Sequence, residues 1–229
     1  MSSAPLPPKN EAELLARAAS LAGRSLQTLA EILDRRLPED LAHNKGWVGD
    51  LVEQALGATA GNRPTPDFPR LGIELKTLPV DAAGHPTEST FVTAAPLRTI
   101  GELSWANSPV RSKLARVLWI PVEADPVLPL PVRRLGSPLL WSPSPEEDRG
   151  LAVDWEELTA LVREGDFSAL TAHHGRWLQV RPKGADSRAR TQAYGQDGTL
   201  EATSPRGFYL RRSFTTALVA AHYHRGSGA

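Results

Sequence analysis

The spacing of apolar and polar positions along the chain predicts a mixed series of helices and strands. Helical spacing predicts one helix from a cap at Asn10 to about Ala22, a second after a cap at Ser25, and a third over residues 46–57. Alternation in DFPRLGIELKTLP, residues 67–79, instead predicts a half-buried strand. These elements show no regular strand–helix–strand rhythm and no internal repeat. We therefore expect an α/β (mixed) fold, with a mixed β-sheet flanked by helices.

The rest of the chain continues this mixture. We predict that residues 88–97 form a partner strand for the first one, and that the continuous apolar run at 115–124 is a buried central strand. A helix is predicted after a cap at Ser144, strands at 176–182 and 206–212, a loop at 183–198, and a last helix capped by Ser213. For domain organisation, we expect a tail at 1–9, a single two-lobed domain at 10–224 and a second tail at 225–229.

Composition narrows the class of protein. A chain of 229 residues that is 41% hydrophobic can bury a substantial core. It contains no cysteine, which excludes disulfides and thiolate metal sites and fits a reducing compartment. The polar, Pro-rich start does not resemble a signal peptide, and the apolar runs are too short to cross a bilayer. We expect a soluble, cytoplasmic protein.

The net charge of zero conceals an uneven distribution. Residues 123–166 carry ten acidic and four basic side chains, a local charge of −6, whereas residues 171–212 carry eight basic and three acidic ones, a local charge of +5. Such a division permits a basic surface on a neutral protein. Two unrelated solvated faces are the alternative interpretation.

Three charged residues of the first strand suggest a chemical site. Residues two apart on a strand project from one face, roughly 7 Å apart, so Glu74 and Lys76 point together, and Asp67 lies where the chain enters the strand. Two carboxylates can hold Mg²⁺ through oxygen ligands, and a nearby ammonium can position a water or stabilise charge on a phosphate. The pattern therefore suggests metal-assisted phosphodiester hydrolysis. An exposed Glu–Lys pair on a solvated strand face is the alternative.

The third helix carries a second signal. Gly46, Gly49, Glu53 and Gly57 fall within a narrow arc opposite its apolar stripe. Interior glycine costs about 1 kcal/mol relative to alanine, so a glycine-lined face suggests that something approaches closely. We expect that partner to be the strand with Glu74 or a DNA backbone.

Several longer strings carry a resemblance to a known family. KGWVGDLVEQALGATAG, DFPRLGIELKT, KLARVLWIPVE, GSPLLWSP, WLQVRPK and PRGFYLRRSFT follow one another in the order found in the MutH family of DNA mismatch repair endonucleases. The resemblance spans almost the whole chain. It implies a restriction-endonuclease-like fold, with two lobes around a DNA-binding cleft and a signature of an aspartate followed by Glu-x-Lys.

The resemblance also implies roles for individual residues. Asp67 and Glu74 match the metal-binding carboxylates, with Leu75 beside them as a further metal ligand, and Lys76 matches the catalytic lysine. Glu53 matches a further active-site glutamate. The remaining matches are a basic residue near the catalytic site, Lys113, and five DNA-binding positions: Lys45, Phe91, Arg181, Lys183 and Tyr209. Arg188 and Arg211 are further expected DNA contacts, and a solvated pair of Arg211 and Arg212 is the alternative for Arg211. Tyr209 occupies the position that senses adenine methylation in the family.

The activity implied by the family is specific. A MutH-like enzyme nicks the unmethylated strand of a hemimethylated GATC site, using one or two Mg²⁺ ions, with Mn²⁺ as a substitute, and it leaves 5′-phosphate ends. MutL activates it after MutS has found a mismatch, and we expect a monomer on double-stranded DNA, with no membrane partner. Two alternatives stay open: a restriction endonuclease that cuts both strands unaided, and a catalytically silent reader of adenine methylation.

Overall fold

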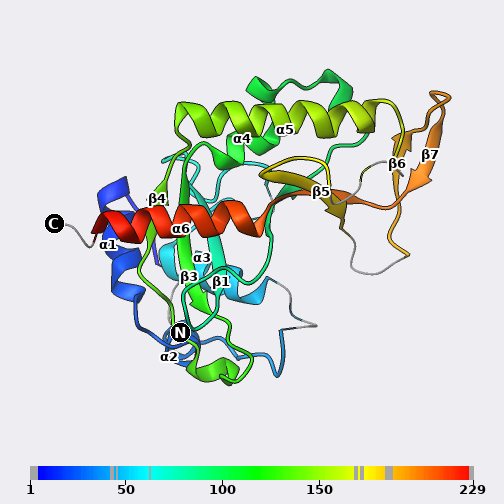
Figure 1. The fold of residues 1–229 in the computed structure, drawn as a ribbon. Coiled ribbons are helices and arrows are strands. Elements are labelled where there is room, and N and C mark those ends of the chain that lie inside the picture. Colours follow the sequence, from blue (N-terminus) through cyan, green and yellow to red (C-terminus); the bar gives the residue numbers. More distant parts are fainter. Residues whose placement is uncertain are drawn as a thin grey trace. The chain divides into compact units, whose positions relative to one another are not determined.

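The computed structural model describes residues 5–41, 44, 46–61, 63–167, 170, 173–183 and 188–226 (Figure 1). These residues divide into two compact units. Unit 1 comprises residues 1–87 and 115–142, and unit 2 comprises residues 88–114 and 143–229. Each unit is therefore assembled from segments that are distant in the sequence. No helix in the described parts of the chain is both long and apolar enough to cross a membrane.

The helices of unit 1 begin at the expected caps. Helix α1 (Glu11–Leu21) follows Asn10, whose side chain accepts a hydrogen bond from the Glu13 N–H, and α2 (Leu26–Ile32) follows Ser25, which accepts one from Thr28. Helix α3 (Trp47–Leu56) lies between two glycines in the left-handed conformation. All three bury apolar faces in a single core of unit 1, which confirms the periodicity that predicted them.

The sheet of unit 1 is mixed. Strand β3 (Val117–Glu123) lies in the centre, parallel to β1 (Glu74–Val80) and antiparallel to β4 (Leu139–Trp141). Six of the seven residues of β3 are buried, as its continuous apolar run predicted. Helix α3 packs against β1 (Figure 1), and the short 3₁₀ helix η3 (Leu130–Val132) packs against α2. The strand that carries Glu74 and Lys76 is thus paired on one side and covered by a helix.

Unit 2 contains a three-stranded antiparallel sheet and a hairpin. Strand β8 (Arg206–Leu210) lies between β2 (Thr90–Ala94) and β5 (Leu178–Pro182). The hairpin pairs β6 (Thr191–Tyr194) with β7 (Leu200–Thr203). The helical elements of unit 2 are two 3₁₀ turns, η1 (Ile100–Glu102) and η2 (Trp105–Asn107), and three helices, α4 (Pro109–Leu114), α5 (Pro145–Arg163) and α6 (Arg212–Gly226).

A buried carboxylate anchors the beginning of β5 to α5. Asp154, which is 3% exposed, accepts hydrogen bonds from the backbone N–H groups of Arg176, Trp177 and Leu178 at 2.6 to 2.8 Å. These three hydrogen bonds stabilise the buried negative charge, and they also give the three backbone N–H groups an acceptor. Beside it, Trp155 stacks on Phe208 of β8 with ring centroids 4.9 Å apart. Helix α5 therefore fixes the position of the central and edge strands of this sheet.

Three sequence predictions are wrong in their detail. Strand β2 pairs with β8 and not with β1. The stretch 183–198 is not all loop, because residues 191–194 form strand β6. The last helix begins at Arg212, so Ser213 lies inside it and does not cap it. The mixed α/β fold class is confirmed, although the strands form three separate sheets. The division into a two-lobed domain with two tails stays a prediction.

Candidate active site and DNA-reading face

A local turn places Asp67 beside the first residues of β1. Phe68 and Ile73 form an isolated antiparallel bridge, and Gly72 in the left-handed conformation (φ +64°) lets the chain reverse between them. The turned-back chain places Asp67 Oδ2 within 2.8 Å of the Leu75 backbone N–H, from which it accepts a hydrogen bond. Both Asp67 and Leu75 are buried. The turn between Phe68 and Ile73 therefore fixes this carboxylate against the strand.

Glu74 and Lys76 form an ion pair on β1 in which the carboxylate is buried and the lysine is largely buried. Lys76 Nζ donates to Glu74 Oε1 at 2.6 Å, and the two side chains are 16% and 2% exposed, respectively. The half-buried strand expected from the alternation is thus covered on both faces at its beginning. This burial removes the alternative of a solvated surface pair. Burying two charges is costly unless they are paired or bind an ion, so a function for the pair becomes the better explanation.

Glu53 of α3 completes a group of interacting charges. Its pKa is raised to about 7, first because burial disfavours its charge, and then because the carboxylates of Asp67, Asp50 and Glu74 repel it, while Lys76 acts in the opposite direction. Electrostatic interactions with both Asp67 and Glu74 require that all three carboxylates lie in one region. The structure therefore brings together four of the five residues predicted from sequence as catalytic, and the fifth, Lys113, belongs to unit 2. Asp50 is a further member that the sequence prediction missed.

The donor atoms at this site fit a hard divalent cation. Among the described residues, no group of three or more His, Cys, Asp or Glu side chains has the arrangement of a metal site. Mg²⁺ does not need one, because it is commonly held by one or two carboxylates, with water and substrate phosphate as its other ligands. Asp67 and Glu74 provide two buried carboxylates, and Leu75, whose backbone carbonyl is a further oxygen donor, directly follows Glu74 in sequence. These groups suit Mg²⁺ better than the nitrogen- and sulfur-rich sites of zinc.

The glycine-lined face of α3 has two different explanations. A Cβ on Gly49 would lie 3.9 Å from Thr77 Oγ1, so this glycine faces β1 as expected. Gly57 instead faces the N-terminal segment, because a Cβ there would lie 2.7 Å from the Leu6 carbonyl oxygen. Gly46 is a left-handed residue before the helix with open space around it. The close partners of Gly49 and Gly57 are thus β1 and the N-terminal segment.

In unit 2, aromatic rings and cations gather on one face of the β2–β8–β5 sheet. The rings of Phe91 and Tyr209 meet edge to face with centroids 5.3 Å apart. Lys183 Nζ lies 3.3 Å from the centroid of Phe91, and the Arg181 guanidinium lies 5.8 Å from that of Tyr209. We call these four residues the reading face. They place exposed positive charge and partly exposed rings on one surface. Such a surface suits contacts with the phosphates and bases of DNA.

Two backbone features shape the reading face. The register between β2 and β8 shifts between Phe91 and Thr93, a bulge of the kind that redirects side chains at functional edges. Gly207 leaves room for both rings, since a Cβ there would lie 2.8 Å from Phe91 and 3.3 Å from Tyr209. Burial raises the pKa of Tyr209, with Arg181 lowering it and Glu88 raising it further. Gly207 and Glu88 were not among the residues predicted from sequence.

The other predicted DNA-binding residues have different settings. Arg211 is partly buried, and its guanidinium donates to the backbone carbonyls of Gly175 at 2.9 Å and His174 at 2.6 Å, so it braces the segment before β5. Arg188 is exposed. Lys113 is half-buried in α4 of unit 2, whereas the carboxylate site belongs to unit 1. Lys45 lies outside the described residues. The functions of all these residues stay predictions.

Comparisons with known proteins identify the relatives of this chain. The family described as "DNA mismatch repair enzyme MutH" matches residues 56–154, a range that includes Asp67, Glu74 and Lys76. Proteins named DNA mismatch repair protein MutH are similar over nearly the whole chain. The one from Serratia proteamaculans is 56% identical over 97% of this chain and 98% of its own. That from Salmonella paratyphi C is 54% identical, over 95% and 94%. That from Escherichia coli K12 is 52% identical, over 95% of each chain.

These comparisons identify the class of protein. The mixed α/β architecture is that of the restriction-endonuclease-like proteins. Within that class, the chain belongs to the MutH family.

Proposed function

We propose that this protein, by its family a DNA mismatch repair endonuclease, nicks the unmethylated strand of hemimethylated GATC sites by Mg²⁺-dependent hydrolysis. The observation that carries the proposal is the convergence of Asp67, Glu74, Lys76 and Glu53 around the beginning of β1. A buried acidic group with one amine suits hydrolysis of a phosphodiester, whose transition state spreads negative charge over oxygen atoms.

Asp67 and Glu74 would hold the ion, with the Leu75 carbonyl as a third protein ligand. When bound, Mg²⁺ supplies positive charge that stabilises the developing charge on the scissile phosphate. The Leu75 N–H keeps Asp67 in place through a 2.8 Å hydrogen bond, so this carboxylate is already oriented before any ligand arrives. In this proposal, one or two Mg²⁺ ions act at the site.

Lys76 and Glu53 would orient the attacking water and accept its proton. In the proposed step the water oxygen forms a bond to phosphorus while the bond from phosphorus to O3′ breaks, leaving a 5′-phosphate and a 3′-hydroxyl. The water loses one proton and the departing O3′ gains one. In the metal-free protein, burial and neighbouring carboxylates raise the pKa of Glu53 to about 7, which makes it the proposed proton acceptor, and Lys76 can orient the water or stabilise negative charge. Lys113 is proposed to support this site.

The reading face would recognise the duplex. Lys183 and Arg181 provide cations for phosphates or base edges, while Phe91 and Tyr209 provide flat apolar surface against which an adenine methyl group would be distinguished from hydrogen. Arg188 and Lys45 are proposed as additional phosphate contacts. GATC specificity itself rests on family membership. So do activation by MutL, with MutS acting before it, the monomeric state and the cytoplasmic location.

Two other functions stay in competition. A restriction endonuclease would share the carboxylate–lysine site but would cut both strands without a partner. A silent reader of methylation would need the reading face but not a buried ion pair. The buried pair of Glu74 and Lys76 favours a catalyst over the silent reader, because an idle charged pair of this kind is seldom stabilising.

A nicking assay on plasmid DNA tests the proposal. We expect slow nicking of hemimethylated and unmethylated GATC substrates with Mg²⁺, strong stimulation by MutL, and no cutting of fully methylated DNA or in EDTA. Glu74→Gln and Lys76→Met should bind the same DNA but fail to nick it. Rapid double-strand cleavage without MutL would support the restriction enzyme, and the absence of any metal-dependent cleavage would support the silent reader.

A further inference from the structure

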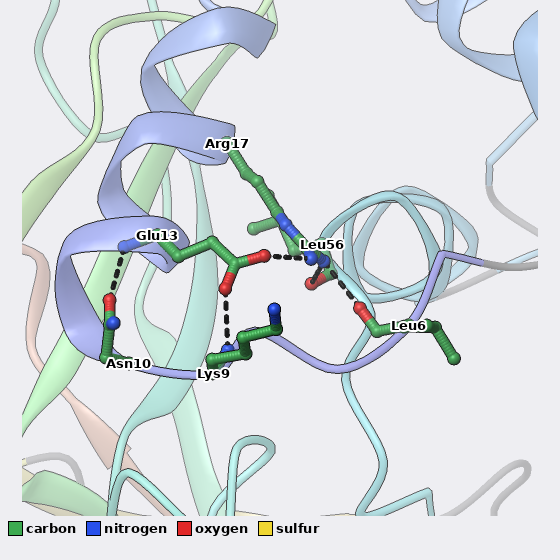
Figure 2. Close-up of polar contacts among 6 residues, drawn as sticks. All are labelled: Leu6, Lys9, Asn10, Glu13, Arg17 and Leu56. Carbon is green, nitrogen blue, oxygen red and sulfur yellow. Dashed lines mark hydrogen bonds and ion pairs between the residues drawn. The ribbon is translucent and has the colours of Figure 1, made fainter.

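The N-terminal segment lies directly against the helix that carries Glu53. We call residues 5–8 the strap. It has no regular secondary structure, but the Leu6 carbonyl accepts a hydrogen bond of 2.6 Å from Arg17 Nη1 of α1 (Figure 2). The same nitrogen reaches the carbonyl of Leu56, the last residue of α3, at 3.4 Å. One guanidinium therefore joins the strap, α1 and the end of α3.

Glu13 holds that guanidinium in place. Its Oε1 accepts from Arg17 Nη2 at 2.5 Å, and its Oε2 accepts from the backbone N–H of Lys9 at 2.8 Å (Figure 2). The carboxylate thus orients the arginine and also fixes the chain immediately after the strap. Both arms of the fork-shaped guanidinium are used, which a lysine at this position could not reproduce.

Gly57 lets the strap approach the end of α3 without a gap. A Cβ at this residue would lie 2.7 Å from the Leu6 carbonyl oxygen and 3.0 Å from that of Pro5. Gly57 also has a left-handed conformation (φ +78°), which glycine adopts without strain. Glycine at this position thus permits both the left-handed conformation at the end of the helix and the close approach of the strap.

The strap forms one wall of a pocket that Glu53 lines. The pocket has a volume of about 610 Å³, and Pro5, Asp50, Glu53 and Gly57 are among the residues that line it. Pro5 belongs to the strap, while Glu53 lies one helical turn before Gly57. The contacts that hold the strap in place therefore also hold one wall of the pocket that Glu53 lines.

We propose that the strap and Arg17 position Glu53 for the nicking reaction. Arg17 is a positioning residue in this proposal: it acts on the last turn of α3 and on the pocket wall, and through them on Glu53. The inference rests on the proposed role of Glu53. Effects of this kind are large, because a displacement of about 1 Å at a reacting group can cost on the order of 100-fold in rate.

The test compares full-length variants in steady-state nicking and in DNA binding. Arg17→Met keeps the length of the side chain but removes its donors, and Gly57→Ala pushes the strap away. We expect each to lower kcat by roughly ten-fold or more, with KM for DNA within about two-fold of wild type. Arg17→Lys should recover part of the loss, since one ammonium can still reach the Leu6 carbonyl.

Matched controls exist in the same network. Lys9 takes part through its backbone N–H and Leu6 through its backbone carbonyl, and the Leu6 residue is 80% exposed. Lys9→Ala and Leu6→Ala should therefore nick at the wild-type rate. In metal-free protein, hydrogen exchange at the backbone amide of residue 9 should accelerate in Arg17→Met. It should stay slow in both controls.

A double variant separates positioning from simple stabilisation. If Arg17 acts through Glu53, adding Arg17→Met to Glu53→Gln lowers kcat no further. A second, independent loss in the double variant would overturn the inference, as would a loss in Arg17→Met that equals the fall in folded protein measured by circular dichroism. Wild-type nicking by Glu53→Gln alone would instead overturn the proposed role of Glu53, whatever Arg17 does.

Discussion

Lys76 donates a 2.6 Å hydrogen bond to Glu74 two residues earlier on the same strand, and the Glu74 side chain is only 2% exposed. Neighbouring residues on one strand face rarely bury opposite charges together without a reason, because desolvation offsets most of their attraction. The proposed function gives this pair a chemical role, and its removal should affect activity and stability in different ways.

Lys76→Met should lower the nicking rate by about 10²–10⁴-fold, the usual range for loss of a proton-handling or charge-stabilising group, without weakening DNA binding. It should also destabilise the fold by roughly 3 kcal/mol, because the buried Glu74 carboxylate loses its ammonium. Urea unfolding measures the second effect. Adding Glu74→Gln should restore most of the stability but none of the activity. Lys9→Ala is the matched control, and a Lys76→Met variant as stable as wild type would contradict the ion-pair argument.

The raised pKa of Glu53 makes stability depend on pH. Its pKa is about 7 in the folded protein against an ordinary value of 4.5, so between these values the folded state binds more protons than the unfolded state. The free energy of unfolding should consequently fall as pH rises from about 4.5 to 7.

Glu53→Gln removes this pH dependence. In EDTA we expect the variant to match wild type near pH 4.5 and to exceed its stability by on the order of 1–2 kcal/mol at pH 8, after allowing for solvent screening of a partly exposed group. Chemical denaturation at a series of pH values measures the difference. Parallel curves for the two proteins would show that the Glu53 carboxyl titrates normally.

Lys183 and Arg211 should respond differently to substitution, although both were predicted from sequence to contact DNA. Lys183→Ala should weaken DNA binding and reduce the slope of log affinity against log salt by about 1, as expected for loss of one phosphate contact. Arg211→Lys should leave that slope unchanged, because its guanidinium donates to the carbonyls of His174 and Gly175. Its effect should be on thermal stability. Fluorescence anisotropy at several salt concentrations distinguishes the two.

Asp154→Ala should cost about 2–4 kcal/mol of stability, because three backbone N–H groups at the beginning of β5 lose a charged acceptor. The neighbouring residue Val153 is 68% exposed on the same helix, so Val153→Ala should change stability by less than about 0.5 kcal/mol. Thermal unfolding compares the two variants. A similar effect for both would mean that Asp154 is not the anchor of β5.

Local features were the ones that sequence patterns predicted well. Capping by Asn10, Ser25 and Ser144 depends on atoms within three residues, and the structure confirms all three caps. The proximity of Asp67 to β1 likewise depends on one short turn.

Features that depend on distant segments were not predictable in this way. Alternation identified β2 as a strand but not its partner β8, because the pattern fixes which face is buried and not which strand lies beside it. The hairpin of β6 and β7 was missed because most of its residues are exposed, so it has no apolar face to reveal it. The bracing role of Arg211 also escaped prediction, since an arginine that donates to backbone carbonyls leaves no periodic signal.

The hydrogen bond from the Leu75 N–H to Asp67 has an evolutionary implication. The positions of Asp67, Glu74 and Lys76 relative to one another are set by residues 67–76 of unit 1, whereas the rings and cations of the proposed reading face belong to unit 2. On the proposed function, substitutions in the reading face would leave the arrangement of Asp67, Glu74 and Lys76 intact. A related nuclease could then change its target sequence through unit 2 alone, and a protein engineer could follow the same route.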